Sequence, residues 1–416
     1  MPAATPISPV QQENRRARVA VGLLFLTNGA VPANLVPLFP SIKSGLGLSN
    51  AQFGFAIAAG PIGALCSGLL AGVLIRRFRS SRVAVTGMIL ASGCALLAGV
   101  SPTGVLLAAS LFLLGALDSV VDVAQNSHGL RVQRRYGRSI LNSFHAIWSV
   151  GAVLGALMGG VAAGLGIPPG IHLSISATIF AAVNIIGYRF LLPGPEPLEV
   201  AAPTPAPGAA PFRNSVRWGT YATLLALGLI AVSGSIVEDA GSSWAALYLS
   251  GSLGAGATVA ALGFVALAGM QFVGRIIGDR LVDRFGQRAV ARTGGAITAV
   301  GMGLALAFPS IPGTIIGLGA AGFGIATLVP AAMHTADELP GLRAGTGLSL
   351  LSWMMRLGFL LSPPVVGLIA DATSLRVGLL LVPVAGLLVV VLARVLPRRA
   401  VGRPVVLTGS AEEPPG

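Results

Sequence analysis

The sequence predicts an all-α integral membrane protein of 12 transmembrane helices, arranged as two pseudo-symmetric six-helix bundles around a central cavity. The 416 residues are 54% hydrophobic and only 10% charged, with a mean hydropathy of +0.83, whereas a soluble domain carries about 25% charged residues. Apolar runs of roughly 20 residues, the length at which a helix crosses a ~30 Å hydrocarbon core, repeat along the chain. Two motifs recur at one spacing, which indicates an internal duplication.

The apolar runs give the expected spans. In the first half they cover 19–39, 51–75, 83–100, 104–123, 140–164 and 171–192. In the second half they cover 218–249, 255–278, 289–308, 312–333, 345–370 and 377–396. The alternation of a barrel strand is absent from these runs, so helices are the remaining way to satisfy the backbone in lipid.

The runs divide the chain into an N-terminal tail (1–18), a first bundle (19–192), a linker (193–217), a second bundle (218–396) and a C-terminal tail (397–416). The linker is rich in Pro and Ala and has little apolar surface to bury.

Basic residues predict the orientation, because Lys and Arg accumulate in cytoplasmic loops. With the N-terminus inside, only Lys43 and Arg376 fall outside and Arg356 falls within a span, which leaves 27 − 3 = 24 basic residues on the cytoplasmic side. Both tails are therefore expected in the cytoplasm. The net charge of +13 sits in short loops without interleaved aromatics, so nucleic acid is not an expected partner.

The internal duplication is visible in two places. The segments after the second and eighth spans share Leu74, Arg77 and Phe78 with Leu281, Arg284 and Phe285, at an offset of 281 − 74 = 207. Gly151 in the fifth span and Gly358 in the eleventh have the same offset. Two unrelated motifs at one spacing are typical of transporters built from parallel repeats.

These motifs resemble those of the major facilitator superfamily, and the resemblance extends over 19–396. The family's basic loop has the pattern G-x-L-x-D-R-x-G-x-R. The second copy begins at Asp279 and has the family's residues at Asp283, Arg284, Gly286 and Arg288. The first copy, which includes Arg77, has Arg76 at the position of the family's Asp and Arg79 at the position of its Gly.

The resemblance implies a gating role for this loop. The family's Asp meets the cytoplasmic start of a helix in the opposite half and steadies the outward-open state, so Asp283 is expected near Asn142 at the start of the fifth span. A carboxylate is stabilised there by the helix dipole and free backbone N–H groups. Because Arg76 cannot play that part, the gate is expected to be held on one side only.

A second resemblance concerns the segment 118–129 together with 143–145, which is similar to the fucose-permease-like branch of the superfamily. In the superfamily the first, fourth, seventh and tenth spans line a central cavity that opens alternately to each side. Substrate sites in such folds lie near the midplane between the repeats.

Ionisable residues inside the spans are the main site candidates: Asp118, Asp122, Glu238, Asp239 and Arg356. Each costs roughly 2.5–3.5 kcal/mol at a helix centre unless it is paired, hydrated or functional. Asp118, Asp122 and Gln125 follow i, i+4, i+7 spacing and share one helix face. Asp239, adjacent to Glu238, is expected to point elsewhere.

We expect Asp118 and Glu238 to be a titrating pair, with Arg356 as the cation that tunes one of them. A carboxylate in a cavity gains or loses a proton according to its desolvation and its neighbouring charges, as proton coupling requires. The alternative is that Arg356 and one acid form a fixed structural pair while Asp122 faces water.

Other polar residues in the spans allow two interpretations each. Asn28 either presents its amide to a solute or packs, and His145 either relays protons or forms packing hydrogen bonds. Trp244 either stacks on a solute ring or packs. His128 lies just beyond the expected end of the fourth span.

Small residues in two spans let helix backbones approach closely: Gly151, Gly155, Gly159, Gly160, Gly358 and Pro363. In the superfamily this glycine motif is associated with exporters that exchange protons for substrate. Ala156, however, stands where the family has Pro, which leaves the direction of transport open.

The function expected is secondary transport of a small organic solute by alternating access, coupled to protons and directed outward as an exporter or antiporter. The alternative is uptake of a sugar or metabolite by proton symport, and a third possibility is a non-transporting scaffold or membrane enzyme. Catalytic, nucleotide-binding and metal-ligand motifs are absent from the sequence, so no cofactor is expected. The protein is expected to be a monomer in the inner membrane of a bacterium.

Overall fold

The computed structural model describes residues 9–137, 140–194, 218–339 and 346–398, and every regular element in these ranges is helical. Among these described residues, eleven helices are long and apolar enough to cross a membrane, and the count is 12 if one bent pair forms a single span. The predicted all-helical membrane fold is therefore confirmed. Most of the predicted linker and C-terminal tail, and the first eight residues, lie outside the described residues.

The first half contains the N-terminal helices. They are α1 (Pro9–Leu35), the 3-10 turn η1 (Val36–Leu38), α2 (Phe39–Gly45), α3 (Asn50–Ser67), α4 (Leu70–Phe78), α5 (Ser80–Gly99), α6 (Gly104–Tyr136), α7 (Leu141–Gly164) and α8 (Pro169–Tyr188). The second span is the bent pair, because α3 and α4 meet at 60°.

The second half contains the C-terminal helices. They are α9 (Trp218–Leu247), the π-helical turn η2 (Tyr248–Ser252), α10 (Ala257–Phe285), α11 (Gln287–Ala307), α12 (Ile311–Ile325), α13 (Leu328–Asp337), α14 (Thr346–Ala372), α15 (Leu375–Gly378), α16 (Leu381–Leu392) and η3 (Ala393–Val395).

The fourth span is longer than its apolar run, since α6 continues from the expected end at 123 to Tyr136. Helical hydrogen bonding continues through this polar stretch until Gly137 adopts a left-handed conformation with φ of 66° and caps the helix. His128, expected beyond the span, consequently lies inside α6.

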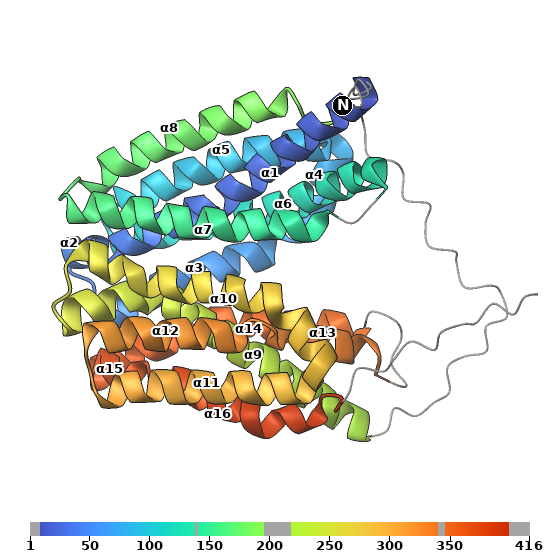
Figure 1. Ribbon diagram of the computed structural model, residues 1–416. Helices are drawn as coiled ribbons and strands as arrows, with labels where there is room; N and C mark the ends of the chain where they lie inside the picture. Colours follow the sequence, from blue (N-terminus) through green and yellow to red (C-terminus); the bar gives the residue numbers. More distant parts are fainter. Residues whose placement is uncertain (1–8, 138–139, 195–217, 340–345, 399–416) are drawn as a thin grey trace, which may run out of the picture.

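The two halves form separate bundles that lie side by side (Figure 1). Between them α3 packs on α14 and α7 packs on α10. We call the end where α4 and α10 finish, at Phe78 and Phe285, the tail end. The end where α3 begins at Asn50 and α14 finishes at Ala372 is the opposite end. Toward the tail end α7 and α10 diverge (Figure 1).

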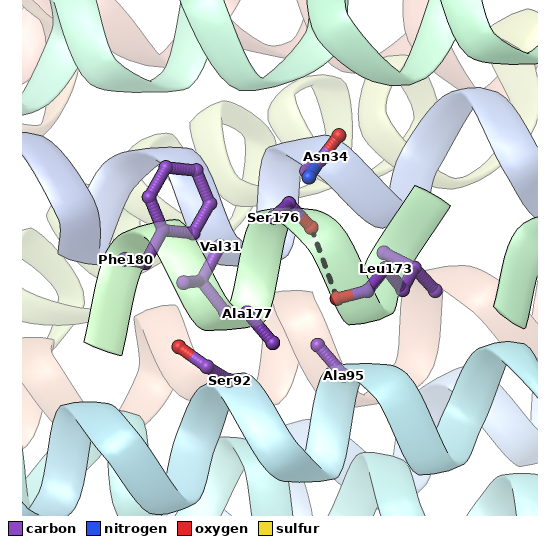
Figure 2. Close-up of a pocket in the computed structure, with 8 residues that line it drawn as sticks. All are labelled: Val31, Asn34, Ser92, Ala95, Leu173, Ser176, Ala177 and Phe180. Carbon is purple, nitrogen blue, oxygen red and sulfur yellow. Dashed lines mark hydrogen bonds between the residues drawn. The ribbon is translucent and has the colours of Figure 1, made fainter. Parts of the chain in front are cut away.

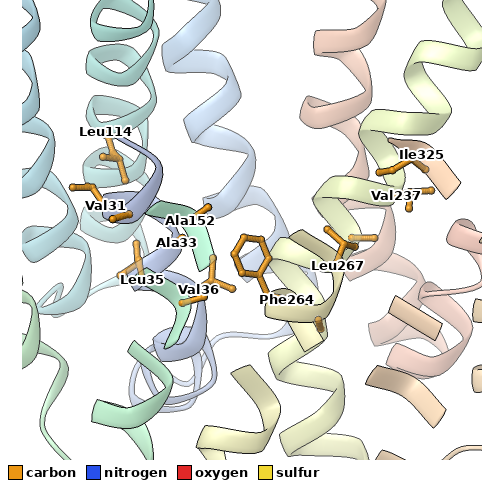
Figure 3. Close-up of a cluster of buried hydrophobic side chains, with 14 of the residues drawn as sticks. Val31, Ala33, Leu35, Val36, Leu114, Ala152, Val237, Phe264, Leu267 and Ile325 are labelled. Atoms are coloured by element: carbon orange, nitrogen blue, oxygen red, sulfur yellow. The ribbon is translucent and has the colours of Figure 1, made fainter. Parts of the chain in front are cut away.

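Close packing joins the halves toward the opposite end. A Cβ atom on Gly54 of α3 would collide with the carbonyl oxygen of Pro363 in α14, and one on Gly160 of α7 would lie 2.5 Å from the Cβ of Ala261 in α10. In the same region the η1 turn contacts α10, and Figure 3 shows Val36 beside Phe264. We call these contacts the interhalf seal.

Aromatic and polar contacts extend the interhalf seal. The ring of Phe53 in α3 lies edge-on to Phe39 at 5.4 Å and to Trp244 of the second half at 5.7 Å, between centroids. The carboxylate of Asp371 in α14 accepts hydrogen bonds from the backbone N–H groups of Asn50 (2.9 Å) and Ala51 (2.8 Å). Asp371 thus caps the first turn of α3 across the interface.

Glycines also join α1 to α7 within the first half. A Cβ atom on Gly151, Gly155 or Gly159 would collide with a backbone carbonyl oxygen of α1. The two helices therefore touch backbone to backbone along three successive turns.

The duplicated loop has the same backbone conformation in both copies. Arg79 has φ 73° and ψ 146°, and Gly286 has φ 82° and ψ 154°. In each copy this residue's N–H bonds the carbonyl four residues earlier, in Ile75 and Val282, at 2.8 Å. Arg79 is the one described residue other than glycine with a positive φ.

Candidate functional site

A buried amide connects three helices of the first half. Asn28 of α1 is 3% exposed, and its side chain bonds Asp118 and Gln125 of α6 and Trp148 of α7. We call these four residues the Asn28 cluster. The indole Nε1–H of Trp148 can only donate, at 2.9 Å, so the atom that it meets is the amide oxygen of Asn28. The Asn28 Nδ2 group must then donate to Asp118 Oδ1, at 2.8 Å.

The Asn28 cluster has unused hydrogen-bonding capacity. The Nε2 group of Gln125 donates to Asn28 Oδ1 at 3.2 Å, but its Oε1 atom is buried and has no partner among the described residues. Buried acceptors are normally satisfied, so this atom is available to a donor from a bound molecule or water. The carboxylate of Asp118 is half-buried.

The predicted shared face of α6 is present. Asp122 is exposed, and its Oδ1 atom accepts from Gln125 Nε2 at 3.4 Å and from Asn126 Nδ2 at 3.0 Å. Asp118, Asp122 and Gln125 thus belong to one hydrogen-bonded row that meets α1.

The expected pairing of Asp118, Glu238 and Arg356 is not formed in this conformation. Glu238 accepts a hydrogen bond from Gln271 of α10 at 3.1 Å, so its partner lies in its own half. The two ion pairs between described residues join Arg135 to Glu13 and His334 to Glu338. Arg356 is half-buried in α14 and belongs to neither.

Sequence reasoning missed Arg275. This residue lies inside α10 and within the expected span 255–278, but the sequence analysis counted it among the cytoplasmic basic residues. The charges of Arg275 and Asp122 both act on His145. Arg275, Asp122 and His145 are all exposed and come from the two halves. An arginine inside an apolar run was the available signal. The three residues thus form a polar group to which both halves contribute.

His128 holds helices together. It is buried, its Nδ1 atom lies 2.8 Å from Ser80 Oγ, and its Nε2 atom accepts from the backbone N–H of Leu192 at 3.1 Å. Since a backbone N–H can only donate, Nε2 carries no proton and the ring is neutral with its proton on Nδ1. These bonds tie α6 to the start of α5 and to the segment after α8.

Two hollows lie away from the acids. A cavity of ≈ 10 Å³ between α1, α5 and α8 is shown in Figure 2, with Asn34 at its edge. Asn34 Oδ1 lies 2.6 Å from His172 Nε2, while its Nδ2 atom has no described partner. A hollow of ≈ 270 Å³ between the halves has Pro37, Pro168 and Ser250 in its wall. Neither lining contains an ionisable side chain.

The loop motif lies at the tail end. Arg77 lies 5.7 Å from the ring centroid of Phe78, and in the second copy Arg284 lies 5.5 Å from that of Phe285. Asp283 is exposed and makes no hydrogen bond or ion pair with another described residue.

The remaining motif residues also lie at this end. Arg76 and Asp279 are exposed, and Arg288 donates from Nε to the carbonyl of Leu396 at 2.9 Å. The side chain of Asn142, the partner expected for Asp283, lies outside the described part of the chain.

Two bundles of membrane-spanning helices with a buried polar cluster define a polytopic membrane protein. The family model described as Major Facilitator Superfamily matches residues 21–281 and 239–414. The chain belongs to the major facilitator superfamily and is therefore a membrane transporter rather than an enzyme. The superfamily predicted from the sequence is thereby confirmed, whereas the fucose-permease-like branch stays a prediction.

Known proteins are similar over nearly the whole chain. The uncharacterized transporter y4wD of Sinorhizobium fredii (strain NBRC 101917 / NGR234) is 31% identical over 382 residues, covering 91% of this chain and 97% of the relative. A mutant of the nucleoside transporter NupG has a similar fold, with a TM-score of 0.72, 13% identity and coverage of 91% and 98%. A D-xylose-proton symporter has a TM-score of 0.68, 15% identity and coverage of 92% and 98%.

Proposed function

We propose that this protein carries a small polar organic solute across the bacterial cytoplasmic membrane by proton-coupled alternating access, with the Asn28 cluster as part of the solute site. The buried Gln125 Oε1 atom without a partner is the observation that carries this proposal. A solute with hydroxyl or amine donors would satisfy it, and the Trp148 ring offers an apolar face beside it.

Asp118 is the proposed proton-binding group. Its described hydrogen-bond partner is the neutral Asn28 amide, and no described ion pair includes it. A half-buried carboxyl group without a cation gains from carrying a proton when the site closes and from losing it when water enters. Each proton that moves inward supplies about 2.3 kcal/mol per 100 mV of membrane potential.

The proposed orientation places the tail end in the cytoplasm, in line with the distribution of basic residues. In that orientation the described conformation is sealed toward the outside. Transport requires the interhalf seal to open while the tail-end parts of α7 and α10 approach each other.

The direction that we propose is uptake by symport. The glycine motif that suggested export packs α7 against α1, so packing is a sufficient explanation of it. The amides of the Asn28 cluster suit a hydroxylated solute, and the proteins of similar fold include a D-xylose-proton symporter. Export by proton antiport is the second candidate, and it is supported by the family association of the same motif.

Reconstitution in proteoliposomes tests this proposal. Counterflow with a panel of sugars, polyols, nucleosides and amines identifies the solute. An acidic exterior then drives its accumulation if the coupling is symport. Asp118→Asn should remove accumulation against the gradient and leave solute exchange intact, because exchange does not require the proton to dissociate. Glu13→Gln, at an exposed ion pair with Arg135, is the matched control and should accumulate normally.

Three outcomes would contradict the proposal. Retained accumulation in Asp118→Asn would remove this residue from coupling. Accumulation driven only by an acidic interior would favour antiport. If the reconstituted protein shows counterflow of none of the solutes in the panel, transport of a small polar solute would be contradicted.

A further inference from the structure

A second buried acid lies in the other half of the protein, between α9 and α14. Asp239 is 6% exposed, and its Oδ1 atom accepts a hydrogen bond from Ser243 Oγ at 3.0 Å. Ser362 of α14, 1% exposed, lies beside the same carboxyl group. We call these three residues the Asp239 site.

Two oxygen atoms of the Asp239 site lack partners. Asp239 Oδ2 and Ser362 Oγ are both buried, and neither has a hydrogen-bond partner among the described residues. The described ion pairs do not include Asp239, and the one charge that acts on it is the acid Glu238. A carboxylate here would be a buried charge with a like charge next to it and no cation, which is among the most unfavourable arrangements in a protein.

Binding of one proton to Asp239 removes this unfavourable buried charge. When Oδ2 is protonated the carboxyl group is neutral, and its O–H group can donate to Ser362 Oγ, so a single hydrogen bond satisfies both atoms. We propose that Asp239 is a proton-binding site separate from the Asn28 cluster, and that it is protonated in the conformation described here. This deepens the proposed function but does not depend on the solute or on Asp118.

The Asp239 site lies directly behind the interhalf seal. Ser362 is followed by Pro363, whose carbonyl oxygen faces Gly54 of α3. Because Pro363 and Pro364 have no N–H group, they cannot bond the carbonyls four residues earlier, and α14 is easier to deform at this level. A change in how α9 packs on α14 is therefore transmitted to the contact between α14 and α3.

The protonation state of Asp239 is coupled to closure of the opposite end. A neutral Asp239 is compatible with the dry contact between α9 and α14, and hence with a closed opposite end. Loss of the proton creates a carboxylate that needs water, so the contact must loosen. Protonation thus favours the closed opposite end, and this preference is lost as the pH rises.

Spin-label distances in lipid nanodiscs test the proposal without any solute. Cys66 and Cys94, the two native cysteines, are replaced by Ala. Ser44→Cys and Thr373→Cys then place labels at exposed positions of the two halves at the opposite end. The fraction with the short distance should fall as the pH is raised from about 5 to about 9. Asp239→Asn, a fixed neutral substitute, should keep the short distance throughout.

Matched variants separate this site from the others. Glu13→Gln, at an exposed acid outside both the Asp239 site and the Asn28 cluster, should keep the pH response. Ser362→Ala removes the hydroxyl group beside the Asp239 carboxyl group and should shift the midpoint of the pH response. This variant also covers the case in which Asp239→Asn does not fold.

Several results would overturn the assignment. They are a pH response in Asp239→Asn equal to that of the parent, a parent distance that does not change with pH, or a distance that responds to Na⁺ at fixed pH and not to protons. Failure of the transport assays alone would contradict the proposed solute transport and leave these distances unaffected.

Discussion

A single side chain shows how the duplicated loop diverged. Arg79 has the backbone conformation that Gly286 has in the second copy, with φ of 73° against 82°. This region of φ and ψ is suited to glycine, and a residue with a Cβ atom is strained there by about 1–3 kcal/mol. The first copy thus keeps the family's turn after losing the residue that makes it easy to form.

Arg79→Gly should therefore stabilise the protein, by about 1–2 kcal/mol, because it relieves this strain. The measurement is the midpoint of thermal unfolding in detergent, followed by tryptophan fluorescence. Arg79→Ala is the control, since it removes the same charge but keeps a Cβ atom, and it should give little gain. An equal rise in both variants would mean that charge, not backbone strain, is responsible.

Sequence periodicity located the acids but not their partners. The spacing of Asp118 and Gln125 correctly placed them on one face of α6. The amide that joins them comes from α1, and only the close contact of α1 with α7 brings Trp148 to the same atom. Asp239 was correctly expected to point away from Glu238, yet its burial against Ser362 depends on how α9 and α14 pack. A linear pattern carries no information on that packing.

At the scale of elements, hydropathy found each span but not each helix end. The start of α6 matches the apolar run, whereas its end is set by the left-handed Gly137. The bend between α3 and α4 was not expected either, because the apolar run continues across the break between them. Helix ends and bends depend on local capping and backbone geometry, to which a hydropathy window is insensitive.

The cap on α3 predicts a conformational effect. The carboxylate of Asp371 sits near the C-terminus of its own helix, which is unfavourable for a negative charge, so the N-terminus of α3 supplies the compensation. Asp371→Asn should destabilise the conformation in which the opposite end is closed by about 0.3–1 kcal/mol. The ratio of closed to open protein should therefore fall roughly two- to fivefold. The Ser44/Thr373 spin pair measures this. The control is Asp337→Asn, at an exposed acid of the tail end, which should leave the distances unchanged. If Asp371→Asn also leaves the distances unchanged, the cap does not stabilise the interhalf seal.

For the whole molecule, the duplication predicted two bundles and both were found. The sequence could not predict which end of the molecule is closed, because that depends on contacts between the bundles. A repeat constrains the interior of each half, whereas two arrangements of the same halves differ by only a few kcal/mol.

Substitutions at two glycines can distinguish the folding of one half from the closure of the two halves against each other. Gly155 touches α1 within the first half, whereas Gly54 touches Pro363 across the interface. Gly155→Val should lower the yield of folded protein and its unfolding midpoint, because α7 can no longer approach α1. Gly54→Val should fold, because the halves can separate there, and should populate a longer Ser44/Thr373 distance at every pH. If Gly54→Val instead unfolds while Gly155→Val is tolerated, the contact between α3 and α14 is part of a single rigid core, and movement between the halves at this end would have to be abandoned.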